Sequence, residues 1–244
     1  MKNTAKSSGV YLLPNLFTTA ALFAGFYAIV AALKGASLQD TSYFEHAAIA
    51  LFVAMIMDSV DGRVARLTGT VSDFGAQYDS LSDMLCFGVT PALVTYSWAL
   101  STLGKLGWLA AFVYTAATAL RLARFNIQSE EQDKKYFIGL PCPAAAAVIA
   151  SMVWLGVEFA MPGKILSVIV AIVTVIMALC QVSSFKYYSF KDLGLKGNVP
   201  FVAVLVVVLM FTLIAFDPPR ILGAVFLTYA LSGPCLWLYD KYKT

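Results

Sequence analysis

Histidine and cysteine are scarce in this sequence. One histidine, His46, and four cysteines occur among its 244 residues. A single histidine leaves almost no material for a histidine metal cage or for histidine-based nucleophilic catalysis. The cysteines lie far apart inside apolar runs, so we interpret them as small buried hydrophobic residues rather than disulfide partners or zinc ligands. They are Cys86, Cys142, Cys180 and Cys235. Any chemistry must therefore rest on carboxylates.

Charged residues are also few. They make up 13% of the chain, whereas apolar residues make up 60%; soluble domains have about 25% and about 45–50%, respectively. Such a chain cannot cover itself with polar surface, and its mean hydropathy of +0.78 indicates a polytopic membrane protein. The net charge of +3 is too small and too dispersed to indicate nucleic-acid binding.

Eight apolar segments are long enough to cross a bilayer, which requires about 20 helical residues. They are Tyr11–Leu33, Ala47–Leu67, Leu81–Leu100, Leu106–Phe125, Ala144–Phe159, Ile165–Ser183, Val199–Phe216 and Ile221–Tyr239. Lys2 and Lys6 before the first segment resemble the start of a signal peptide, but the apolar run is too long for one, and we expect a retained span. The sequence therefore predicts an all-α polytopic membrane protein with one catalytic domain over residues 1–244.

The distribution of Lys and Arg predicts the orientation. With the N-terminus inside, 13 of the 17 basic residues fall on the cytoplasmic side, and only Lys34, Lys105, Lys164 and Arg220 fall on the other. Because cytoplasmic loops carry an excess of Lys and Arg, we expect both termini to be cytoplasmic.

Four aspartates stand out because a charged side chain within a bilayer is costly and usually functional. Asp58 and Asp61 are three residues apart, and Asp79 and Asp83 are four apart, so each pair lies on one face of a helix. Two helices can therefore present four carboxylates to one point. Their mutual repulsion would be neutralised by a hard divalent cation such as Mg²⁺, Mn²⁺ or Ca²⁺.

A plainer interpretation of the same residues stays open. The aspartates could simply cap helix ends and pair with Arg63 and Arg66. Against it, small residues accompany the cluster at Gly62, Ala65 and Gly75. Glycine inside a helix costs about 1 kcal/mol relative to alanine, which suggests close approach of a ligand or a second helix.

The region 58–83 reads D-x2-D-G-x2-A-R-x8-G-x3-D-x3-D. This pattern resembles the motif of the CDP-alcohol phosphotransferase family without a departure, and eight identities at fixed spacing make the match specific. The resemblance implies a membrane-helix bundle that transfers a phosphatidyl or phosphoryl group from a CDP-linked donor to an alcohol and releases CMP.

The resemblance also implies roles for individual residues. Asp58, Asp61, Asp79 and Asp83 would hold two divalent ions, Mg²⁺ or Mn²⁺, and Asp83 would also be the general base on the acceptor hydroxyl. The CDP part of the donor would bind a larger set, which is Asn15, Thr18, Asp61, Gly62, Ala65, Arg66, Gly75 and Asp79. Two alternatives stay open: Pro14 and Asn15 could form an ordinary helix start, and Arg66 could snorkel to the membrane surface.

The acceptor region is expected between residues 121 and 145. The stretches 121–126 and 137–145 resemble the phosphatidylserine synthase branch of bacteria and archaea, which implies L-serine as acceptor and CDP-diacylglycerol as donor. Arg121 and Arg124 lie on one helical face, and a guanidinium fork suits the carboxylate of serine; Asn126 follows them. The arginines could instead satisfy the positive-inside topology and bind lipid phosphate or the donor diphosphate.

Competing interpretations differ in acceptor or in class. Within the family the acceptor could be glycerol 3-phosphate, inositol phosphate or choline, although paired arginines disfavour choline. A cation-coupled transporter would also place aspartates in a membrane, but the cluster lies near one face and no repeated halves are visible. By family resemblance we expect a homodimer in a bacterial or archaeal cytoplasmic membrane, with the active site facing the cytoplasm.

Overall fold

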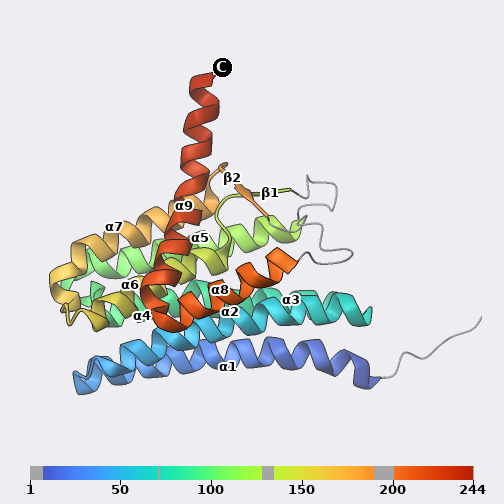
Figure 1. Cartoon of the computed structure of the whole chain (residues 1–244). Helices are drawn as coiled ribbons and strands as arrows, with labels where there is room; N and C mark the ends of the chain where they lie inside the picture. The colour runs from blue at the N-terminus through green and yellow to red at the C-terminus, as the bar shows by residue number, and fades with distance from the viewer. Residues whose placement is uncertain (1–7, 71, 128–134, 190–200, 244) are drawn as a thin grey trace, which may run out of the picture.

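The computed structural model describes residues 8–70, 72–127, 135–189 and 201–243, and helices dominate this part of the chain (Figure 1). The α-helices are α1 (Ser8–Leu38), α2 (Ser42–Thr68), α3 (Asp73–Asp83), α4 (Thr90–Trp98), α5 (Lys105–Ile127), α6 (Cys142–Glu158), α7 (Gly163–Val182), α8 (Phe201–Phe216) and α9 (Pro218–Lys243). A π-helix, η1 (Met84–Val89), joins α3 to α4, and a 3-10 turn, η2 (Leu100–Leu103), precedes α5.

Every predicted apolar segment is mostly helical within the described residues, and Leu81–Leu100 is divided among α3, η1, α4 and η2. Four helical stretches are long and apolar enough to cross a membrane: Leu13–Leu38 in α1, and helices α5, α7 and α9. Two shorter apolar helices accompany them, α6 and the Leu205–Phe216 part of α8. The count of eight spans and the orientation of the termini stay predictions. Part of the charge argument concerns Lys2, Lys6, Lys134, Lys191 and Lys196, which lie outside the described residues.

Small side chains bring the helices close together. Helices α1 and α2 pack along each other over most of their length, α6 packs against α2 and α9, and α5 packs against α7 (Figure 1). Buried alanines such as Ala28, Ala47 and Ala145 belong to the common core. Small residues allow close backbone approach between helices in a membrane, where contact rather than water exclusion drives association.

Helix α3 is held against α1 by polar contacts to the backbone. The Ser82 hydroxyl donates to the carbonyl oxygen of Thr18 at 3.3 Å, and the Cys86 thiol donates to that of Ala21 at 3.2 Å. The helix widens into η1 directly after Asp83, and such π-turns are common at functional sites. These contacts hold α3, with Asp79 and Asp83, and η1 against α1.

A small sheet departs from the all-helical expectation. Strands β1 (Tyr136–Ile138) and β2 (Lys186–Tyr188) pair antiparallel, with Tyr136 opposite Tyr188. They lie at the end of the bundle where α5 ends and α1 begins (Figure 1). The sequence did not predict this pair, because three-residue strands carry no usable periodicity, and the described chain is otherwise dominated by helices.

Candidate active site

The structure brings the predicted carboxylates together. Ligand oxygens of Asp58, Asp61 and Asp79 lie within 4.8 Å of one another. The Asp83 carboxyl group lies within hydrogen-bonding reach of that of Asp58. Helix α2 supplies the first pair at i and i+3 and helix α3 the second at i and i+4, so helical periodicity aims both pairs at one point.

No basic side chain neutralises this cluster among the described residues. The ion pairs there connect Arg220 with Glu158 and Asp217, at a distant part of the chain. Arg66 instead donates from Nε to the carbonyl oxygen of Gly62 at 2.9 Å. Helix α3 is capped by Ser72, whose hydroxyl accepts from the Gly75 amide. Capping and ion pairing therefore do not account for the aspartates.

Two carboxylate oxygens in the cluster lack partners. Asp79 Oδ1 and Asp83 Oδ1 are buried and have no hydrogen-bond partner. A buried polar atom without a partner is costly, and four converging carboxylates repel one another. Oxygen ligands in such a group fit a hard divalent cation, so the cluster could bind a metal ion.

Thr18 orients one of the carboxylates. Its hydroxyl donates to Asp61 Oδ2 at 2.7 Å and lies 3.2 Å from the carbonyl oxygen of Pro14. Both Thr18 and Asp61 are buried. Because a hydroxyl has one proton, the shorter contact to the charged group takes it. Pro14 lies inside α1 rather than at its start, so the alternative of a simple helix start at Pro14 and Asn15 is wrong.

All eight predicted donor-binding residues line one cavity beside the carboxylates. It has a volume of about 290 Å³ and lies between α1, α2 and α3. Its complete lining is Pro14, Asn15, Thr18, Asp61, Gly62, Ala65, Arg66, Thr70, Ser72, Gly75, Ala76 and Asp79. Thr70, Ser72 and Ala76 line the cavity without having been predicted from the sequence. A serine directly before an acidic first turn is an N-cap signal that could have identified Ser72.

The two cavity glycines have different reasons to be glycine. A Cβ atom on Gly62 would meet nothing within 4 Å, so this position opens into the cavity. A Cβ atom on Gly75 would lie 3.1 Å from the Ser72 hydroxyl and 3.7 Å from Asn15 Oδ1. Gly62 therefore leaves room for a ligand, whereas Gly75 lets α3 approach its own cap and α1.

The three predicted acceptor residues lie at the end of α5, in different surroundings. Asn126 donates from Nδ2 to Ser80 Oγ at 2.9 Å, which ties α5 to α3 next to Asp79. Arg124 is half-buried. Arg121 is buried and donates from Nη1 to the carbonyl oxygen of Ile138 at 2.8 Å. Cys142, at the start of α6, lies beside Arg121.

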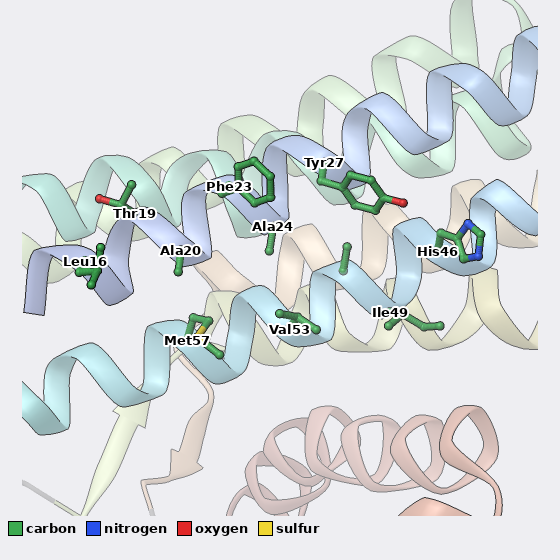
Figure 2. A pocket seen from close by; sticks show the side chains of 11 residues that line it. Leu16, Thr19, Ala20, Phe23, Ala24, Tyr27, His46, Ile49, Val53 and Met57 are labelled. Atoms are coloured by element: carbon green, nitrogen blue, oxygen red, sulfur yellow. The ribbon is translucent and has the colours of Figure 1, made fainter.

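A larger, apolar groove lies elsewhere on the α1 and α2 pair. Its volume is about 760 Å³, and Phe23, Tyr27, Ile49 and Val53 are among its lining side chains (Figure 2). No carboxylate, lysine or arginine lines it. The groove suits hydrocarbon rather than a charged nucleotide, so the smaller polar cavity is the candidate active site.

Comparisons with known proteins agree with this geometry. A family model described as CDP-alcohol phosphatidyltransferase matches residues 11–182. The chain is 34% identical over 237 residues to CDP-diacylglycerol–serine O-phosphatidyltransferase of Helicobacter pylori strain J99, covering 96% of this chain and 94% of the relative. The protein of the same name from Methanocaldococcus jannaschii is 37% identical over 142 residues, covering 58% and 63%. That from Bacillus subtilis is 42% identical over 99 residues, covering 41% and 55%.

Proposed function

Because the chain belongs to the CDP-alcohol phosphatidyltransferase family, we propose that it transfers the phosphatidyl group of CDP-diacylglycerol to the hydroxyl of L-serine. The products are phosphatidylserine and CMP. One observation carries the proposal: the carboxylates of Asp58, Asp61 and Asp79 converge beside a cavity lined by the whole predicted donor set. Similarity over almost the whole chain to the CDP-diacylglycerol–serine O-phosphatidyltransferase of Helicobacter pylori supports L-serine as the acceptor.

The four aspartates would hold the divalent metal ions, two Mg²⁺ or Mn²⁺ in our proposal. When bound, such ions neutralise charge on the diphosphate of the donor. The unpartnered oxygens of Asp79 and Asp83 support this role. Thr18 holds Asp61 in place from α1, so the cluster is pre-organised before the donor arrives.

The cavity between α1, α2 and α3 would bind the CDP group. The open space at Gly62 admits it, and Asn15, Arg66 and Ser72 supply polar contacts. The serine hydroxyl then attacks the phosphorus atom bound to the diacylglycerol, its proton passes to Asp83, and the bond to CMP breaks. A phosphoryl transition state of this kind gains mostly from positioning and from charge stabilisation.

The end of α5 would bind the acceptor. Arg121 and Arg124 are close enough for their charges to interact, and neither forms an ion pair with a described residue. Two unpaired guanidinium groups favour an anion, and the carboxylate of serine is one. Asn126, tied to Ser80, places this region beside the aspartates of α3.

The membrane arrangement is part of the proposal. Eight spans with both termini in the cytoplasm would place the site at the cytoplasmic surface of a bacterial or archaeal membrane, and the protein would be a homodimer. The orientation is tested by the accessibility of cysteines placed at the two termini of the protein in intact cells. The homodimer is tested by chemical cross-linking in the membrane. A terminus labelled only from outside the cell would overturn the orientation.

The acceptor is tested with purified protein, CDP-diacylglycerol and Mn²⁺ or Mg²⁺. CMP release is measured with L-serine, glycerol 3-phosphate, inositol phosphate and choline in parallel. We expect release with serine alone. Preference for another alcohol would replace the acceptor but keep the phosphatidyltransferase chemistry, and no release with any alcohol would favour the transporter alternative.

A further inference from the structure

Arg121 is a buried cation without an acidic partner among the described residues. Its side chain lies at the end of α5 and only 9% of the residue is exposed. The half-buried Arg124 nearby adds a second positive charge. Burying an unpaired charge is costly unless an anion joins it. Because no carboxylate of a described residue pairs with either arginine, the arrangement favours a negatively charged ligand.

Neutral backbone groups determine how the Arg121 guanidinium is turned. Nη1 donates to the carbonyl oxygen of Ile138 at 2.8 Å and to that of Gln181 at 3.4 Å. Nη1 carries two of the five N–H groups of the side chain. Nη1 is directed at these carbonyl oxygens, and the Cys142 thiol lies beside the guanidinium group. No carboxylate of a described residue pairs with Arg121, so its Nε and Nη2 edge can bind the carboxylate of a ligand.

The two carbonyl oxygens come from segments that are tied together. Ile138 ends β1, where it pairs with Lys186 of β2. The Gly139 amide donates to the carbonyl oxygen of Phe185 at 2.8 Å, and the Leu140 amide to that of Cys180 at 2.9 Å. The turn after β1 is therefore pinned to the end of α7 and to the segment leading into β2.

Gly139 allows this turn to approach Arg121. Its φ of +78° lies in the left-handed region, which favours glycine. A Cβ atom there would lie 2.3 Å from the carbonyl oxygen of Gln181 and 2.9 Å from Arg121 Nη1. A larger residue must displace either the backbone of α7 or the guanidinium group itself.

We propose that Gly139 is a positioning residue for the acceptor: with the β1 and β2 pair it orients Arg121 so that the Nε and Nη2 edge receives the carboxylate of serine. This inference rests on the proposed acceptor. Gly139 does not touch the substrate and acts through Arg121.

The test compares Gly139→Ala with the control Gly104→Ala. Gly104 also has a positive φ, +57°, but a Cβ atom there meets nothing within 4 Å. Both substitutions strain a left-handed backbone, and only the first crowds Arg121. We expect Gly139→Ala to raise the KM for serine about tenfold or more, since small misplacements at a reacting centre are costly. The KM for CDP-diacylglycerol should stay within about twofold, and Gly104→Ala should change neither.

A second readout holds even if the variant folds poorly. The ratio of kcat/KM for serine to that for serinamide does not depend on the amount of folded enzyme, and serinamide lacks the carboxylate. Gly139→Ala and Arg121→Lys should both collapse this ratio. A collapse with Arg121→Lys alone would overturn the role of Gly139 and keep the acceptor site. A collapse with Gly139→Ala alone would mean that Gly139 does not act through Arg121, and this would overturn the proposal. No collapse in either variant would overturn the proposed acceptor site itself.

Discussion

Replacing Thr18 by valine tests whether the aspartate cluster is a pre-organised metal site. The Thr18 hydroxyl donates to Asp61 Oδ2 at 2.7 Å, and both residues are buried. Valine has nearly the same shape but cannot donate a hydrogen bond. The substitution therefore removes the contact that orients Asp61 without opening a cavity.

The size of the effect follows from the kind of bond that is lost. A hydrogen bond to a charged group contributes about 1.5–3 kcal/mol, and loss of a partner that orients a metal ligand typically weakens metal affinity about 10–100-fold. We expect the Mn²⁺ concentration that gives half-maximal CMP release to rise by that factor. At saturating Mn²⁺ the turnover should recover most of its original value, because the ligand itself remains.

Two measurements test the expected loss of Mn²⁺ affinity in Thr18→Val. They are Mn²⁺ binding by electron paramagnetic resonance and the Mn²⁺ dependence of CMP release. The matched control is Thr174→Val on α7, where a buried threonine hydroxyl donates only to the carbonyl oxygen of Val170 in its own helix. The control should leave the Mn²⁺ dependence unchanged. An unaltered Mn²⁺ titration in Thr18→Val, or an equal shift in the control, would refute a metal site organised from α1.

Three further predictions concern the same site. Asp83→Asn should lower turnover far more than donor affinity, because a lost proton acceptor acts in the transition state; an equal fall in donor affinity, measured by equilibrium binding, would make Asp83 mainly a metal ligand. Gly62→Val should raise the KM for CDP-diacylglycerol about tenfold by filling open space, with little change in thermal stability, and a lowered melting temperature with an unchanged KM would contradict this. Excess EDTA should abolish CMP release and added Mn²⁺ or Mg²⁺ should restore it; full activity in EDTA would exclude the metal role.

Local features of this protein followed from the sequence because they depend on helical periodicity and hydropathy. Apolar runs of bilayer length became helices, and aspartates three or four positions apart became carboxylates on one helical face. The donor set from Asn15 to Asp79 was predicted by resemblance to a motif, and it lines one cavity. The 58–83 part of this set could be matched because its spacing is local to two adjoining helices, whereas Asn15 and Thr18 lie on α1.

Tertiary structure decided the contacts between segments distant in the sequence. The bond from Thr18 to Asp61 and that from Asn126 to Ser80 depend on the relative rotation and translation of packed helices, which periodicity within one helix does not specify. The pairing of Tyr136–Ile138 with Lys186–Tyr188 joins strands too short to carry a pattern. The sequence therefore determined which side chains face inward, whereas packing between helices determined which of them meet, including the backbone carbonyl oxygens that turn Arg121.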